Sequence, residues 1–223
     1  MSPQRIGIIH PGAMGISLAA AAQNSGHEVY WASHGRSSQT HDRAAAFSLH
    51  DTSTLAQLCK TCDVIVSVCP PHAVQDVANQ VLSHEFQGHF LDVNAIAPQR
   101  AREMGTALTS AGMTFTDGGI IGGPAWQPGK TWLYLSGPQA AIAASWFAAG
   151  PLETNVVGDT IGEASALKMC YAAYTKGTTA LLCAVLAAAH QLGVQDALYA
   201  QWEREDTGAA EQSVRRVQQV TAK

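Results

Sequence analysis

Short apolar runs alternate with longer, helix-like segments over the first 150 residues of the chain. Residues 13–25 and 98–111 have helical composition, and residue 26 is a glycine of the kind that ends helices. The apolar runs that predict strands are residues 5–9, 27–32, 63–68, 90–93, 114–117 and 131–135. Strands that alternate with helices are typical of a parallel sheet with crossover helices, so the pattern predicts an α/β fold.

Two stretches interrupt this pattern and are predicted to be loops. Residues 33–40 are polar and rich in Gly and Ser, and residues 118–129 hold five glycines and two prolines. From residue 161 to residue 192 the chain is proline-free and mostly Ala, Leu and Cys, which predicts one helix of about 30 residues, about 45 Å long. Shorter helices are predicted at 196–205 and 209–220. We therefore expect two domains, residues 1–158 and 159–223.

Composition limits what the protein binds. Hydrophobic residues make up 47% and charged residues only 13%, below the roughly 25% of ordinary domains, which favours helices packed on a subunit partner. We therefore expect a homodimer formed through the C-terminal helices. The net charge of -4 provides no basic surface for nucleic acid. The apolar run at 180–189 is shorter than the roughly 20 residues of a membrane span, and no signal peptide precedes residue 5, so we expect a cytoplasmic protein outside the membrane.

The cysteines and histidines do not form a recognisable metal motif. Cys59 and Cys62 form a lone CxxC, which is either a redox pair or half of a zinc site, or simply two cysteines at a helix end. No second pair lies at ligand spacing, and the nine histidines show no HxxxH or HExxH arrangement. The sequence predicts no metal site.

The first strand leads into a glycine-containing turn, residues 10–15, with the sequence HPGAMG. Gly12 and Gly15 occupy the second and third glycine places of the GxGxxG fingerprint, whereas His10 stands at the first. In that fingerprint the second glycine lets the backbone approach a pyrophosphate, and the third lets helix and strand pack closely. The turn is either a simple tight turn or the start of a Rossmann-type dinucleotide-binding domain.

The end of the second strand bears on the choice of dinucleotide. No acidic residue lies between Val29 and His41 to hold a ribose 2′-hydroxyl, as NAD requires. Arg36 is able to pair with a 2′-phosphate, and nearby serines such as Ser33 supply hydroxyl donors. This pattern favours NADP over NAD and over FAD; the alternative is a solvated loop arginine.

Lys168 is a candidate catalytic residue. Between residues 161 and 192 the full charges are Glu163, Lys168 and Lys176. The helical neighbours of Lys168 are small or polar, which suits the wall of a cleft. It is either an ordinary solvated lysine or a partly desolvated proton donor with a lowered pKa.

Four motifs in this order resemble a known family. They are the HPGAMG turn, Cys69-Pro70-Pro71 after the third predicted strand, DGGIIGGP at 117–124 and GEASALK at 162–168. The chain resembles the β-hydroxyacid dehydrogenases of the 6-phosphogluconate dehydrogenase-like superfamily, over nearly its whole length. The resemblance implies a Rossmann-type, mostly parallel sheet followed by an all-α region built on one long helix.

The resemblance also implies residue roles. Gly122 and Gly123 match a loop that binds a substrate carboxylate, and Lys168 matches the lysine that protonates the carbonyl oxygen as hydride arrives. The residues implied in cofactor binding are Gly12, Ala13, Met14 and Gly15 at the pyrophosphate, Ser33 and Arg36 at the adenosine ribose, and Val68, Cys69, Pro70 and Asn94 along the nicotinamide ribose.

Some positions depart from the family's pattern. Ile121 stands where the family has a serine before its paired glycines, and Ala172 stands where it has an asparagine. The family's chains run longer, so the resemblance implies a shortened C-terminal region. We expect an NADP-dependent oxidoreductase acting on a small carbonyl or hydroxy-acid-type molecule; the alternative is a non-catalytic NADP-binding regulatory or scaffolding module.

Overall fold

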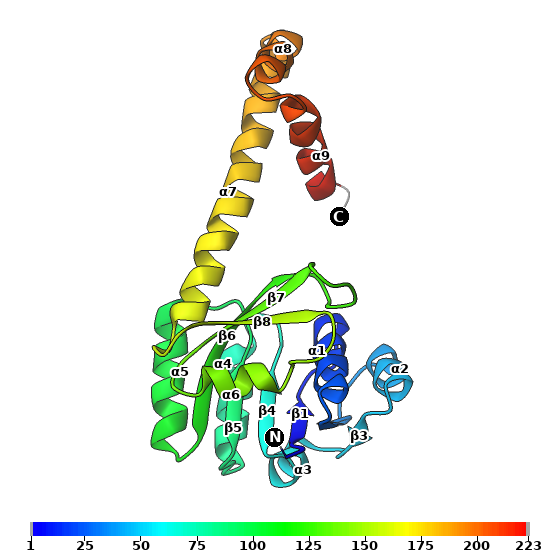
Figure 1. Cartoon of the computed structure of the whole chain (residues 1–223), viewed down its shortest axis with the longest axis vertical. Coiled ribbons are helices and arrows are strands. Elements are labelled where there is room, and N and C mark those ends of the chain that lie inside the picture. Colours follow the sequence, from blue (N-terminus) through cyan, green and yellow to red (C-terminus); the bar gives the residue numbers. More distant parts are fainter. Residues whose placement is uncertain (1, 222–223) are drawn as a thin grey trace. The chain divides into compact units, whose positions relative to one another are not determined.

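A computed structural model describes the backbone of residues 2–221 and the side chains of residues 2–218. One mostly parallel sheet has the strand order β3-β2-β1-β4-β5-β6-β7-β8, and only the β6–β7 pair is antiparallel. The strands are β1 (Arg5–Ile8), β2 (Glu28–Trp31), β3 (His50–Asp51), β4 (Val64–Ser67), β5 (His89–Asp92), β6 (Thr114–Gly122), β7 (Thr131–Ser136) and β8 (Leu152–Gly158). The predicted Rossmann-type sheet followed by a helical region is confirmed (Figure 1).

Helices cover both faces of the sheet. Core residues of α1, α2 and α6 pack on one face, and those of α3, α4 and α5 pack on the other. The helices are α1 (Ala13–Asn24), α2 (Ser38–Ala46), α3 (Leu55–Thr61), α4 (Val74–Ser83), α5 (Pro98–Ser110), α6 (Ala140–Ser145), α7 (Glu163–Gln191), α8 (Gln195–Glu205) and α9 (Ala209–Thr221). Helix α1 ends where Gly26 takes a φ of 86°, a conformation that glycine adopts without strain.

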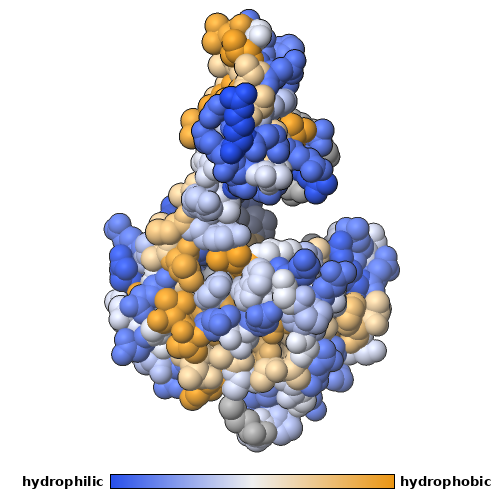
Figure 2. All heavy atoms as spheres, turned by 45° about the horizontal axis from the view of Figure 1, so that its top comes forward, coloured by the Kyte–Doolittle hydropathy of each residue, from blue (hydrophilic) through white to orange (hydrophobic). Residues whose placement is uncertain are grey.

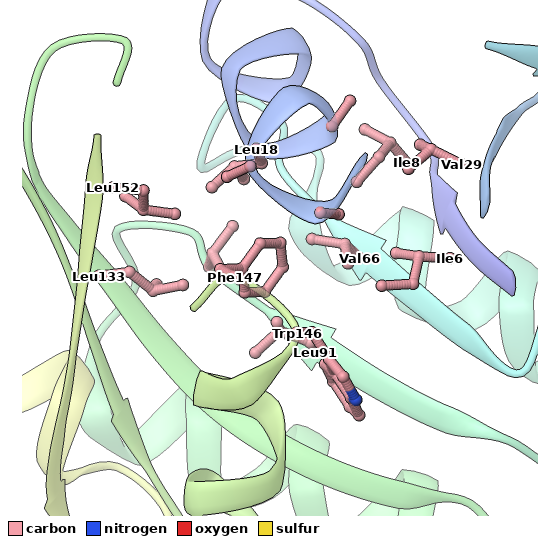
Figure 3. Packing of buried hydrophobic residues seen from close by; sticks show 14 of the residues in the cluster. Ile6, Ile8, Leu18, Val29, Val66, Leu91, Leu133, Trp146, Phe147 and Leu152 are labelled. Carbon is pink, nitrogen blue, oxygen red and sulfur yellow. The ribbon is translucent and has the colours of Figure 1, made fainter. Parts of the chain in front are cut away.

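The core under α1 connects this helix to β7 and β8 at one edge of the sheet. Leu18 of α1, Leu133 of β7 and Leu152 of β8 point toward Phe147, which follows α6 and is fully buried (Figure 3). Burial of such side chains provides most of the stabilisation of a domain of this size. This packing holds α1, and the turn before it, firmly against the sheet.

The structure corrects both predicted loops in part. Strand β6 continues through the glycine-rich stretch as far as Gly122, because the glycines admit close neighbours: a Cβ on Gly118 would lie 2.8 Å from the Asp92 carbonyl oxygen. Helix α2 begins at Ser38 inside the predicted loop at 33–40, and the Ser37 side chain accepts a hydrogen bond from the Thr40 amide as its cap. Strands β3 and β8 and helices α2, α4 and α6 have no counterpart among the predicted elements.

The chain divides into two compact units, Met1–Met169 and Cys170–Lys223. The predicted long helix is confirmed as α7, whose first seven residues belong to the first unit. The predicted role of residues 159–223 as a separate substrate and dimerisation domain stays a prediction.

Helix α7 is more apolar along its length than the ten-residue run at 180–189 indicated. Within the described residues it alone is long and apolar enough to cross a membrane, judged by length and composition only, and little of it is buried. Large apolar side chains are exposed on it and just after it, including Tyr174, Leu181 and Leu192. Figure 2 shows hydrophobic residues at the surface of the second unit near the end where α7 meets α8.

Candidate functional site

Loops that follow β1, β4 and β5 meet at the carboxyl edge of the parallel strands, where open α/β sheets bind their ligands. They form two adjoining hollows in the first unit. The first, called the turn hollow, measures about 270 Å³ and is lined by His10, Gly12, Ala13, Met14, Gly15, Val68, Cys69 and Pro70. The second, called the lysine hollow, measures about 240 Å³ and is lined by Met14, Val68, Cys69, Pro71, Val93, Asn94, Ala95, Ile120, Gly122 and Lys168. Met14, Val68 and Cys69 line both hollows, so a long ligand is able to extend from one into the other.

The turn after β1 has the backbone of a phosphate cradle. Gly12 is the N-cap of α1, and no side chain of the described residues caps the N-terminus of this helix. A Cβ on Gly12 would meet nothing within 4 Å, whereas a Cβ on Gly15 would lie 2.1 Å from the His10 carbonyl oxygen. Gly15 is therefore needed for packing, and Gly12 leaves open space in front of the helix amides. Both features fit a bound diphosphate.

His10 adds an imidazole where the fingerprint has a glycine. Its Nδ1 is buried and has no hydrogen-bond partner in the described part of the chain. Burial, with a smaller contribution from the positive charge of Arg36, lowers the pKa of His10 to about 4. The ring is therefore neutral at physiological pH.

Ser33 and Arg36 lie after β2 and line neither hollow. The Arg36 amide donates to the Ser33 carbonyl (3.1 Å), and Arg36 Nε donates to the Ala32 carbonyl (3.4 Å). Burial lowers the pKa of the Arg36 guanidinium from its usual value, but a guanidinium stays charged in proteins. A half-buried cation thus stands at the end of β2.

Asn94 ties the loops after β4 and β5 together. Its Oδ1 accepts from the Cys69 amide (2.6 Å), and its Nδ2 donates to Ser67 Oγ (2.9 Å) and to Asp92 Oδ1 (2.6 Å). The Asn94 side chain thus bonds to residues at the ends of both β4 and β5. Asn94 therefore holds the Cys69 loop in place at the edge of both hollows.

Lys168 lies on the part of α7 that belongs to the first unit. Its Cβ lies above β6, since a Cβ on Gly119 would be only 3.0 Å from it. Of the two glycines predicted to bind substrate, Gly122 lines the lysine hollow and Gly123 does not. Gly122 has a φ of 115°, so a side chain at this position would strain the backbone.

Sequence reasoning assigned no role to Asp117, although it opens one of the four motifs. Its buried side chain accepts hydrogen bonds from the Ser136 and Ser165 hydroxyls and from the amides of Gly162 and Ser165. The available signal was an acidic residue directly before a glycine pair, in a strand whose other residues are all uncharged.

The CxxC pair lies apart from both hollows. Burial, the main cause, raises the pKa of Cys59 to about 11 and that of Cys62 to about 12, so both thiols stay protonated. Across the described residues, no group of three or more His, Cys, Asp or Glu side chains is arranged to hold a metal ion.

Comparison with known proteins agrees with this geometry. The model of the family described as the NAD binding domain of 6-phosphogluconate dehydrogenase matches residues 5–145. The chain belongs to this family. Its first unit is therefore an NAD(P)-binding domain with the fold of the hydroxyacid dehydrogenases and reductases, and the resemblance found in the four motifs is confirmed.

The proteins similar to this NAD(P)-binding protein include two that share more than 25% identity with it. An uncharacterized 28.5 kDa protein from the 7S RNA 5′ region of Methanothermus fervidus is 30% identical over 195 residues, 87% of this chain and 74% of that protein. A solved structure of a conserved protein of unknown function, described as similar to 3-hydroxyacid dehydrogenases, is 28% identical with a TM-score of 0.77. The match covers 96% of this chain and 81% of the chain in that structure.

A more distant neighbour is similar in fold. An imine reductase variant from Myxococcus stipitatus in complex with NAD+ superimposes with a TM-score of 0.72 at 23% identity. The match covers 98% of this chain and 78% of the reductase. At this identity the likeness concerns the fold alone.

Proposed function

We propose that the protein is an NADP-dependent oxidoreductase that moves a hydride between the nicotinamide and a small carbonyl or hydroxy-acid-type substrate. The observation that carries this proposal is the pair of adjoining hollows. One is built on the glycine turn of an NAD(P)-binding family, and the other is walled by Lys168. A dinucleotide placed along the first hollow would leave its reactive end at the second.

The cofactor would supply the hydride, and the chain would supply the remaining contacts. Gly12, Ala13, Met14 and Gly15 would contact the pyrophosphate. The donors would be the amides of Ala13, Met14 and Gly15, because the Gly12 amide donates to the His10 carbonyl oxygen (2.8 Å). Val68, Cys69, Pro70 and Asn94 would flank the nicotinamide ribose. Lys168 would donate a proton to the substrate oxygen as negative charge develops there. A cation beside a developing alkoxide stabilises it strongly in a site that excludes water.

The preference for NADP rests on the end of β2. Arg36 and Ser33 would contact the 2′-phosphate, and no acid between Val29 and His41 is available for a free ribose hydroxyl. Titration of the protein with NADPH and with NADH tests this preference. We expect tighter binding of NADPH that Arg36→Ala abolishes; a clear preference for NADH overturns the assignment.

The substrate wall favours a less polar substrate than the hydroxy acids of the resembled family. This expectation rests on the resemblance, in which Ile121 and Ala172 stand where that family has hydrogen-bonding residues, and on the apolar Ile120 that lines the lysine hollow. A more apolar carbonyl or an imine would suit such a site. The amides of Gly122 and Gly123 would remain as donors for a carboxylate. NADPH oxidation measured against aldehydes, keto acids and imines distinguishes these classes.

The phosphate cradle is tested by Gly12→Ala. Because an added Cβ meets no protein atom, we expect stability within about 0.5 kcal/mol of wild type. A diphosphate in front of the turn would collide with the methyl group, so NADPH affinity should fall at least about tenfold, or about 1.4 kcal/mol. Gly177→Ala, also in open space but on α7, is the matched control. Unchanged NADPH affinity in Gly12→Ala refutes the proposed binding mode.

The catalytic role is tested by Lys168→Met. We expect NADPH binding to stay intact and turnover to fall by orders of magnitude, whereas Lys176→Met on the same helix keeps its turnover. Unchanged turnover in Lys168→Met refutes the role. Tight NADPH binding by the wild-type protein with no turnover on any substrate of the panel would instead favour the non-catalytic module.

The second unit would form a homodimer. Exposed apolar side chains such as Tyr174, Leu181 and Leu192 lose contact with water when a second copy covers them. Light scattering after size-exclusion chromatography should give the mass of a dimer. Leu181→Glu should reduce this mass, whereas the control Gln191→Glu, at an exposed polar position of the same helix, should leave it unchanged. A monomer in buffer that partitions into lipid vesicles would point to a membrane surface instead.

The dimer would work in the cytoplasm. All five cysteines, Cys59, Cys62, Cys69, Cys170 and Cys183, are free. Free thiols suit a reducing compartment, in which structural disulfides are rare.

A further inference from the structure

The start of α7 is bonded to a buried carboxylate of the sheet. Asp117 lies on β6 and is fully buried. Its Oδ2 accepts hydrogen bonds from the amides of Gly162 (3.1 Å) and Ser165 (2.9 Å), and its Oδ1 accepts one from the Ser165 hydroxyl (2.6 Å). The first amides of a helix have no partners within the helix, and the partial positive charge there favours an anion. Asp117 therefore caps α7 from a neighbouring strand.

Ser136 of β7 extends this cap to a third amide. Its hydroxyl donates to Asp117 Oδ2 (3.0 Å) and accepts from the Ala164 amide (3.0 Å). Both side chains are fully buried, so water does not replace these bonds easily. The first turn of α7 is thus fixed to two adjacent strands of the sheet.

The same strand also sets how closely α7 approaches. A Cβ on Gly119 would lie 3.0 Å from the Ala164 carbonyl oxygen and 3.0 Å from Lys168 Cβ. Lys168 follows Ser165 by three residues, which is less than one helical turn, so the anchored turn determines the position of the lysine. Asp117 itself lines neither hollow.

We propose that Asp117 is a positioning residue, whose bonds to Gly162 and Ser165 set the height and rotation of α7 that bring Lys168 to the lysine hollow. The inference rests on the proposed function of Lys168. Without the carboxylate, buried amides lose their acceptor and the first turn of α7 shifts. A displacement of about 1 Å at a catalytic group costs about 100-fold in rate.

Asp117→Ala, Asp117→Asn and Thr116→Val form the test set. The Asn variant keeps an oxygen for the two amides, and its NH₂ group donates to the Ser165 hydroxyl, so it should restore the anchor. Thr116 is a buried neighbour on β6 that bonds to His89 and not to α7, so Thr116→Val controls for general damage to the strand.

Two readouts follow the anchor and the lysine separately. Amide hydrogen exchange of residues 162–168 reports the anchor without any ligand. Reductive ¹³C-methylation of the lysines gives a resonance for Lys168, assigned by its loss in Lys168→Arg, whose shift on addition of NADP+ reports its place beside the cofactor.

In Asp117→Ala we expect faster exchange at residues 162–168, loss of the Lys168 response to NADP+, unchanged NADP+ affinity and about 100-fold lower kcat. The Asn and Thr116→Val variants should behave like wild type. Wild-type exchange and a wild-type Lys168 response in Asp117→Ala would overturn the inference.

If Asp117→Ala does not fold, Ser165→Ala decides, since it removes only the 2.6 Å bond to Oδ1. It should accelerate exchange of the same residues and weaken the Lys168 response, and a wild-type result for both readouts rejects the inference. Failure of the proposed function would give a different result. The wild-type protein would then not bind NADP+, whereas hydrogen exchange of residues 162–168 would still report on the anchor.

Discussion

Buried Asp92 makes the stability of the sheet depend on pH in a way that can be calculated. It is fully buried at the end of β5, opposite Asp117 of β6. Burial raises the pKa of Asp92 from its ordinary 3.8 to about 7, against the opposing effect of hydrogen bonds from Asn94. The folded protein therefore holds a proton on this carboxyl at pH values where the unfolded chain has released it.

The sign and size of the effect follow from proton linkage. Between about pH 4 and pH 7 the unfolded state binds fewer protons at this site, so rising pH favours unfolding by about 1.4 kcal/mol for each pH unit. The contribution of Asp92 is fully present below pH 4 and is lost as pH rises through about 7. Over about three pH units the total is about 4 kcal/mol.

Comparison of the wild type with Asp92→Asn isolates this contribution. Urea unfolding followed by tryptophan fluorescence gives the free energy of unfolding at intervals from pH 4.5 to pH 8.5. We expect the free energy of unfolding of the variant, relative to that of the wild type, to rise by about 3 kcal/mol from pH 4.5 to pH 8.5, because about 2.4 units of the pKa difference fall inside this range. A constant difference between the two proteins does not affect this change. Parallel profiles for the two proteins would refute the reasoning, because they would mean that Asp92 titrates alike in the folded and unfolded states.

Three further predictions concern the scaffold. Burial lowers the pKa of His89 to about 4, so its contribution to stability is present above the unfolded pKa of about 6.5 and is lost as pH falls toward 4. His89→Gln should flatten the dependence of the free energy of unfolding on pH between these values, as urea titrations measure it. An unchanged slope contradicts this. Cys59 and Cys62 should resist iodoacetamide at pH 8 in the native protein and react after unfolding, as mass spectrometry of the labelled peptides reports; native labelling of either would count against their burial. Phe147→Ala should lower the free energy of unfolding by about 3–5 kcal/mol in urea titrations, and a loss below 1 kcal/mol would mean that the core in Figure 3 relaxes around the missing ring.

Local sequence patterns were sufficient to predict the elements whose hydrophobic or helix-favouring residues follow one another without interruption. The apolar runs that became β1, β4 and β5 are buried over most of their length, so each contains consecutive hydrophobic residues rather than an alternating pattern. The long helix α7 was predicted within two residues at each end, because no proline interrupts it. The glycine turn was recognisable because it joins such a strand to such a helix. The cofactor-binding class of the protein follows from these features.

The sequence by itself therefore determined the alternation of strands and helices, six of the eight described strands, the glycine turn and the presence of a lysine on a long helix. Only the tertiary structure decided that β6 continues through its glycines, since the reason lies in how closely Asp92 and α7 approach them. It also decided that Asn94 bonds to the Cys69 loop and that Asp117 anchors α7, because these partners lie 25 and 45 or more residues apart along the chain. Periodicity reports on neighbours a few positions away; contacts between distant segments depend on how the whole sheet packs.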